Sequence, residues 1–95
     1  MYLSVYRFRG DPAALHTAHA RLLAAIPPAS LQLHLAVTRP QGLDVYDSCP
    51  SLAVAESFSS GDTFGQMLAA AGLPRPEVER LGDIGAAVLE GRRVG

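Results

Sequence analysis

The chain has no lysine, no tryptophan and no asparagine, and Cys49 is its single cysteine. Without lysine, a Schiff base to a carbonyl substrate or to pyridoxal phosphate cannot form. One cysteine excludes an internal disulfide and any cysteine-rich metal centre. The sequence also lacks the Gly-x-Gly-x-x-Gly turn of dinucleotide sites. We therefore expect a protein that works without a cofactor.

Charge is scarce and almost balanced. Eight arginines stand against nine acidic residues, which gives a formal net charge of −1. Such a chain has no basic surplus to neutralise a phosphate backbone, so nucleic acid is not an expected partner. Long apolar runs are missing too, and Arg7, Arg9 and Asp11 lie where a signal peptide is apolar. We expect a cytoplasmic protein that makes no contact with a membrane.

The length of 95 residues is too short for two hydrophobic cores, so we expect one domain over residues 1–95. Hydrophobic residues make up 48% and charged residues 18%, which is typical of a folded globular chain. Alternation of side chains, or a composition typical of β-strands, predicts four strands and one further short strand-like segment. These segments are residues 1–9, 31–38, 43–47, 77–81 and 86–89.

Two helical regions separate these strands. The first begins at Asp11-Pro12, a good helix start, carries an apolar stripe and ends before Pro27-Pro28. The second begins near Ser51, is interrupted at Ser59-Ser60-Gly61 and stops at Gly72. Turn residues 39–42 predict a hairpin between the second and third strands. The resulting β-α-β-β-α-β order predicts an α+β, ferredoxin-like domain with helices on one face of a four-stranded antiparallel sheet.

Alternation within the strands predicts which side chains face the helices. We assign the aliphatic positions of the second strand to the helix side. The opposite face would then carry a semi-apolar, aromatic set, and its members are Tyr2, Tyr6, Phe8, Gln32, His34 and Tyr46. A large exposed apolar face usually marks an interface. We therefore expect two copies to pack sheet against sheet as a homodimer.

Two local segments accompany this order of elements: residues 42–48 (GLDVYDS) at the end of the third strand and residues 71–74 (AGLP) before the last strand. Together, the order and the two segments resemble the dimeric α/β-barrel superfamily. The superfamily includes antibiotic-biosynthesis monooxygenases, haem-degrading monooxygenases and muconolactone isomerases. In its members two sheets form a β-barrel, and the ligand cavity usually lies between a sheet and its own helices. The haem-degrading branch uses an Asn and a Trp that this chain lacks, so haem degradation is not expected.

The resemblance implies a cofactor-independent monooxygenase or isomerase that acts on a small aromatic or polyketide-like compound. His19, Tyr46 and Asp47 would then handle protons. His19 lies within the apolar stripe of the first helix, so it is expected to face the sheet, where a neutral imidazole can accept a proton. The alternative, which we favour from the sequence alone, is a core histidine satisfied by a neighbouring polar group.

Five apolar residues of the helices are expected to lie above the sheet, where they would contact a bound molecule. They are Leu15, Leu22, Phe58, Phe64 and Met67. The alternative is that these side chains fill the space, which would make the protein a non-catalytic dimerisation or ligand-sensing module. A void above about 300 Å³, the lower range of ligand sites, distinguishes the two hypotheses.

Metal binding is not expected. His16 and His19 have the i, i+3 spacing of two ligands on one helix, but alternation places His34 on the opposite side of the sheet from them. Asp44 and Asp47 are three apart on one strand and therefore face opposite sides, so they do not form a carboxylate pair.

Overall fold

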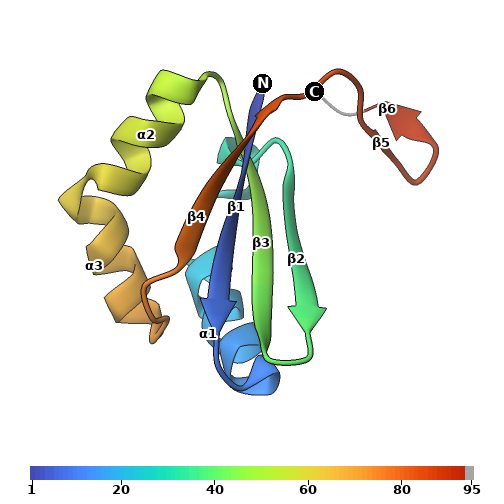
Figure 1. Ribbon diagram of the computed structural model, residues 1–95. Helices are drawn as coiled ribbons and strands as arrows, with labels where there is room; N and C mark the ends of the chain where they lie inside the picture. Colours follow the sequence, from blue (N-terminus) through green and yellow to red (C-terminus); the bar gives the residue numbers. More distant parts are fainter. Residues whose placement is uncertain (94–95) are drawn as a thin grey trace.

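The computed structural model describes residues 1–93, in which a layer of helices packs against a layer of β-strands (Figure 1). Its elements follow the predicted order, with the second helical region divided in two. They are β1 (Tyr2–Arg9), α1 (Pro12–Ala24), the short 3-10 turn η1 (Pro28–Ser30), β2 (His34–Arg39), β3 (Gly42–Cys49), α2 (Leu52–Ser60), α3 (Asp62–Ala71), β4 (Glu77–Asp83), β5 (Val88–Leu89) and β6 (Arg92–Arg93).

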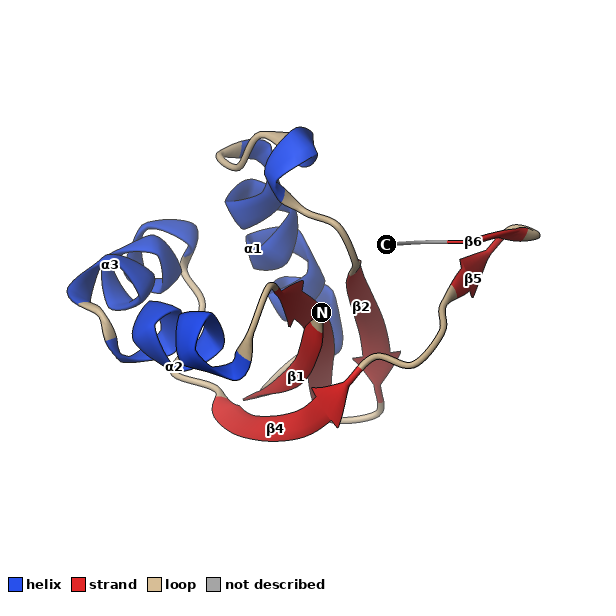
Figure 2. Cartoon of the chain, turned by 90° about the horizontal axis from the view of Figure 1, so that it is seen from above, coloured by secondary structure: helices blue, strands red, loops and turns tan. Residues whose placement is uncertain are grey.

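The first four strands form one antiparallel sheet in the order β2-β3-β1-β4. Figure 2 shows α1, α2 and α3 on one side of this sheet, which leaves the other face uncovered. The predicted ferredoxin-like fold is therefore confirmed. β5 and β6 form a separate hairpin that projects away from the body of the molecule (Figures 1 and 2).

Local sequence signals account for the helix ends. The Asp11 carboxylate accepts a hydrogen bond from the Ala14 amide at 3.0 Å, which caps α1. Ser51 caps α2 in the same way. The predicted interruption occurs at Gly61, which ends α2 and precedes α3. α3 ends at Gly72, whose φ of 83° lies in the left-handed region that glycine adopts without strain.

The hydrophobic core lies between the helices and strands β1 and β3. The residues in this core show that the predicted orientation of β1 is wrong. Tyr6 and Phe8 are each only 4% exposed and belong to this core rather than to the uncovered face. The physical reason is that Arg7 and Arg9 alternate with them. Two guanidinium groups require water or partners, so the arginine side of β1 becomes the open side.

The predicted orientation of β2 is also wrong. Leu35 and Val37 are 43% and 41% exposed, whereas His34 reaches α1. The cross-strand register explains this reversal of the two faces. His34 pairs with Asp47, on the helix side of β3, and Leu35 pairs with Tyr46, on its uncovered side. The aliphatic positions of β2 therefore lie on the uncovered face, which remains partly apolar with a different set of residues.

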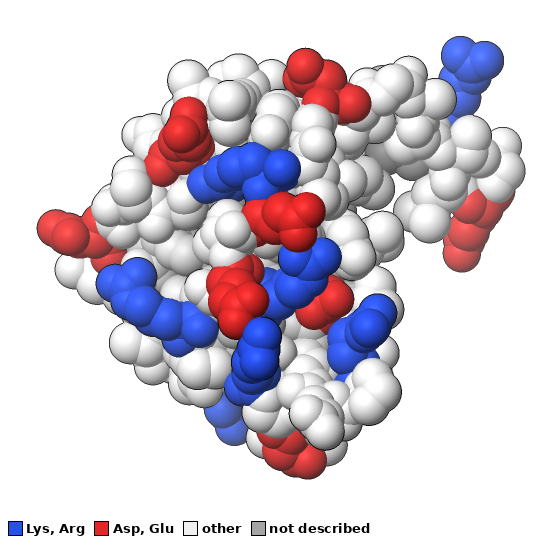
Figure 3. All heavy atoms as spheres, in the orientation of Figure 1, with Lys and Arg blue, Asp and Glu red and all other residues white. Residues whose placement is uncertain are grey.

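Ion pairs occupy the other part of the uncovered face. Arg7 contacts Glu79 at 2.5 Å and Asp44 at 3.8 Å, and Arg9 contacts Glu77 at 2.9 Å. Figure 3 shows this face with basic and acidic atoms alternating over the strands. Within residues 1–93, none of the helices combines the length and apolar character that crossing a membrane requires.

Candidate active site

Three polar side chains from three elements form a hydrogen-bonded chain under the helices. Nδ1 of His34 lies 3.0 Å from Oδ1 of Asp47, and Nε2 of His34 lies 2.9 Å from Nε2 of His19. The two imidazole planes are only 5° from parallel, and the ring centroids are 5.1 Å apart. That separation is nearly the hydrogen-bond length plus both ring radii. The rings therefore lie end to end rather than face to face.

The fold places each member of this chain for a simple reason. His19 lies on the buried stripe of α1 and is 2% exposed. His34 is the first residue of β2, and Asp47 is its cross-strand partner on β3. Directly opposite residues of antiparallel strands bring their side chains close together on one face. β2–β3 pairing therefore builds the His34–Asp47 contact, and the packing of α1 supplies His19.

Burial disfavours a charge on His19. The pKa of its imidazole falls from the ordinary value of 6.5 to about 4, chiefly because of desolvation, with smaller contributions from His34 and His16. His19 is thus neutral at pH 7. The Asp47 carboxylate accepts a hydrogen bond from Nδ1 of His34, so the two histidines are joined to an acidic group.

The hydrogen-bonded chain of Asp47, His34 and His19 borders an apolar cavity between the helices and the sheet. The enclosed volume is about 60 Å³. A neighbouring, more open hollow of about 220 Å³ shares Ile26, Leu31, Asp47, Phe58 and Met67 with it. The cavity as it stands is smaller than the roughly 300 Å³ of ordinary ligand sites.

Tyr6 contributes a second polar group to the cavity wall. Its hydroxyl oxygen is buried and has no hydrogen-bond partner among the described residues. Burial raises the pKa of this phenol, and the nearby Arg80 guanidinium partly offsets the effect. Unpaired buried hydroxyls are uncommon, because leaving one unsatisfied costs about 1–3 kcal/mol. The Arg80 guanidinium is the polar group that lies near this hydroxyl.

Four of the five predicted apolar residues line the cavity: Leu22, Phe58, Phe64 and Met67. Leu15 instead packs in the core and does not reach it. Tyr46 pairs with Val5 and Leu35, on the opposite face of the sheet from His19. The expectation that Tyr46 acts beside His19 is therefore corrected, because neighbouring strand positions face opposite sides.

Among the residues of this site, His34 is one that the strand alternation placed on the wrong face of the sheet. Its neighbours Leu35 and Val37 resemble a buried face, so the pattern favoured the wrong side. The useful signal is His34 together with Asp47, because a hairpin with turn residues 40–41 brings these two residues opposite each other. His16 is exposed, and residues 1–93 contain no group of three metal-ligating side chains.

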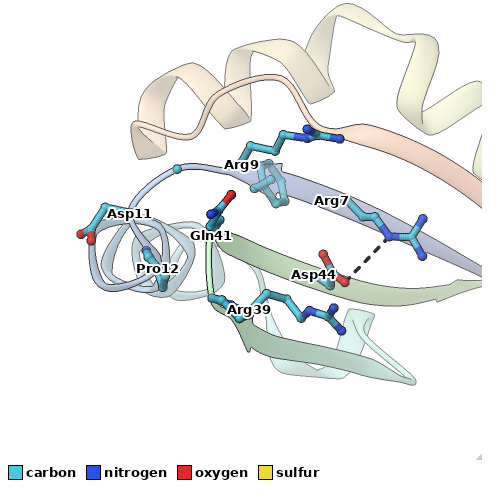
Figure 4. Close-up of a pocket in the computed structure, with 10 residues that line it drawn as sticks. Arg7, Arg9, Asp11, Pro12, Arg39, Gln41 and Asp44 are labelled. Atoms are coloured by element: carbon cyan, nitrogen blue, oxygen red, sulfur yellow. Dashed lines mark ion pairs between the residues drawn. The ribbon is translucent and has the colours of Figure 1, made fainter.

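A larger hollow of about 680 Å³ lies at the far end of β1 and β2. Figure 4 shows Arg7, Arg9 and Arg39 around it, together with Gln41 and Asp44. Arg7 and Arg9 are already paired with acidic residues of β3 and β4. This hollow is a charge-balanced surface feature, whereas the apolar cavity combines enclosure with proton-accepting groups.

The lowered pKa of His19 predicts a pH-dependent stability. Below about pH 6.5 the unfolded chain protonates this histidine, but the folded chain does so only near pH 4. The free energy of unfolding should therefore fall as the pH drops through this window, by about 2 kcal/mol between pH 7 and pH 5. Urea unfolding at pH 7 and at pH 5 measures this difference in the free energy of unfolding. His19→Gln should lose this part of the dependence, and His16→Gln should keep it; equal slopes in all three proteins would contradict the assignment.

Comparisons with known proteins support the fold. No family model matches the sequence, and no curated protein matches it. Among solved structures, the chain is similar to one from Chloroflexus aurantiacus J-10-fl named "putative Antibiotic biosynthesis monooxygenase". The two share 13% sequence identity with a TM-score of 0.61, over 92% of this chain and 96% of the other. At this identity the likeness establishes a common fold.

Proposed function

We propose that the protein is a homodimer that binds a small aromatic or polyketide-like molecule in the apolar cavity and removes a proton from it. The observation that carries this proposal is the Asp47–His34–His19 chain at the wall of an otherwise apolar cavity. Apolar walls with a few convergent polar groups are the usual character of small-molecule sites. The shared fold with a protein named for monooxygenase activity agrees with it.

The proposed reaction needs no cofactor. An aromatic hydroxyl or an activated carbon gives up a proton to the histidine chain, and the remaining anion is electron-rich. In a monooxygenase such an anion reacts directly with dioxygen: one oxygen atom replaces two hydrogens at the activated carbon as a carbonyl, the other leaves as water, and the substrate supplies all the electrons. In an isomerase the anion takes the proton back at another carbon. The unpaired hydroxyl of Tyr6 is a donor for a second oxygen of the same molecule.

Binding requires the cavity to enlarge. Phe58 and Met67 line both the cavity of about 60 Å³ and the neighbouring hollow. They belong to α2 and α3, the two short helices that meet at Gly61. A small movement of these helices joins the two spaces, as lids do in many enzymes.

The small enclosed volume also favours a second candidate. If Phe58, Phe64 and Met67 fill the space permanently, the protein is a non-catalytic dimerisation or ligand-sensing module. Either function uses the same dimer, which we assign to the uncovered sheet face. Leu35 and Val37 are exposed there beside Tyr46, and the ion pairs of Arg7 and Arg9 flank them.

Binding of small phenols and fused aromatic hydroxy-ketones, measured by calorimetry, distinguishes the two functions. We expect a member of this panel to bind the unmodified protein. Met67→Trp places an indole in the cavity and should weaken binding about tenfold or more. Gln66→Trp, on the exposed side of the same helix, is the matched control and should bind normally. Failure of every panel member to bind would favour the module.

A further inference from the structure

One proton must be shared between the two facing nitrogens of His19 and His34. The Asp47 carboxylate accepts the Nδ1–H of His34, so Nε2 of a neutral His34 carries no proton. His19 must then donate its Nε2–H across the 2.9 Å contact. Nδ1 of His19 is consequently unprotonated, so it is the end of the hydrogen-bonded chain that can accept a further proton.

We propose that His34 stores the proton taken from the bound molecule, while His19 only passes a proton on. This inference rests on the proposed function. In the step, the substrate O–H or C–H bond breaks and an N–H bond forms at Nδ1 of His19. The Nε2–H bond of His19 breaks at the same time, and an N–H bond forms at Nε2 of His34. The products are the substrate anion, a neutral His19 of the opposite tautomer, and a His34 imidazolium paired with Asp47.

The surroundings of the two rings explain this division of labour. The His34 side chain is 13% exposed and touches a carboxylate, whereas His19 is 2% exposed and has no acidic neighbour within hydrogen-bond reach. Desolvation lowers the pKa of His19 to about 4, so this ring is a poor place to keep a charge. A relay that never charges His19 avoids that penalty.

Other ionisable groups near the two histidines do not reverse the preference for a positive charge on His34 over His19. From α1, His16 adds a repulsion that further disfavours a charge on His19. From the sheet, Tyr6 and Cys49 have raised pKa values and are neutral at pH 7, and Arg80 interacts with both. The residues that α2 and α3 place on the cavity wall are apolar, namely Phe58, Phe64, Met67 and Leu68.

Nitrogen-15 NMR of the imidazole rings tests the relay on the full chain without any ligand. The sequence has only three histidines, so single substitutions assign every signal. At neutral pH we expect the Nε2–H tautomer at His19 and the Nδ1–H tautomer at His34. When acid adds the first proton to the pair, His34 should become imidazolium while His19 changes to the neutral Nδ1–H tautomer. A His19 that keeps Nε2–H, or that becomes imidazolium first, would overturn the proposal.

Two variants sharpen this titration. Asp47→Asn keeps an oxygen to accept the Nδ1–H of His34 but removes the negative charge, so the first proton should enter the pair at a lower pH. His16→Gln, on the exposed side of α1, should leave the tautomer change in place. An Asp47→Asn titration identical to that of the unmodified protein would contradict storage on His34. Because these readouts need no substrate, a failed relay and a failed search for ligands are separate results.

Discussion

A His19→Ala variant is expected to lose turnover by about 10²- to 10⁴-fold, the usual contribution of a positioned general base. The physical reason is that this substitution removes the accepting nitrogen at the cavity wall and cuts the path to His34 and Asp47. His34→Ala should cost about as much, since the chain acts as a unit and effects within a unit do not add. Dimer formation should be unaffected, because His19 lies on the helix side of the sheet.

The measurement uses the phenol that binds best, with dioxygen uptake followed for a monooxygenase and product NMR for an isomerase. His16→Ala is the matched control, because His16 is exposed on the same helix three residues away. It should retain full turnover. Unchanged turnover in His19→Ala would eliminate His19 as the proton acceptor.

Gly42→Ala is expected to produce the largest loss of stability. A Cβ at this position would lie 2.2 Å from the backbone oxygen of Phe8, and a backbone atom in the central β1–β3 ladder cannot move aside alone. We expect the free energy of unfolding to fall by about 3 kcal/mol or more, at the upper end of overpacking effects. Chemical denaturation of the two proteins measures this difference.

Gly85→Ala provides the control for that experiment. No atom lies within 4 Å of a Cβ built at Gly85, and its φ is not in the left-handed region. Its stability should remain within about 0.5 kcal/mol of the unmodified protein. Equal stabilities of the two alanine variants would show that β1 and β3 do not pair in the register described.

The order of the elements was predictable from the sequence because its signals are local. Asp11 and Ser51 cap helices, Gly72 ends one, and Gly61 interrupts the second helical region, as expected from turn and cap chemistry. The ferredoxin-like architecture follows from that order. These features depend on residues close together in the chain, where side-chain chemistry decides the backbone conformation.

The faces of β1 and β2 were not predictable from alternation alone. A period of two gives two faces without saying which one the helices cover. On β2 the aliphatic side is the uncovered one, and on β1 the arginines mark the open side more reliably than the aromatics. The same error placed His34 away from His19. Alternation placed Tyr46 correctly on the uncovered face, and only the family resemblance set it beside His19. Cross-strand register, a long-range property, determines which face His34 and Tyr46 occupy.

Native mass spectrometry of the freshly purified protein, with and without the phenol panel, tests the central claim most directly. It reports the oligomer and any retained organic molecule in one spectrum. We predict a dimer that carries up to one small molecule for each subunit, with uptake reduced in Met67→Trp. A dimer that takes up no panel member would contradict the ligand cavity and leave the module, and a stable monomer would contradict the assignment of the uncovered sheet face.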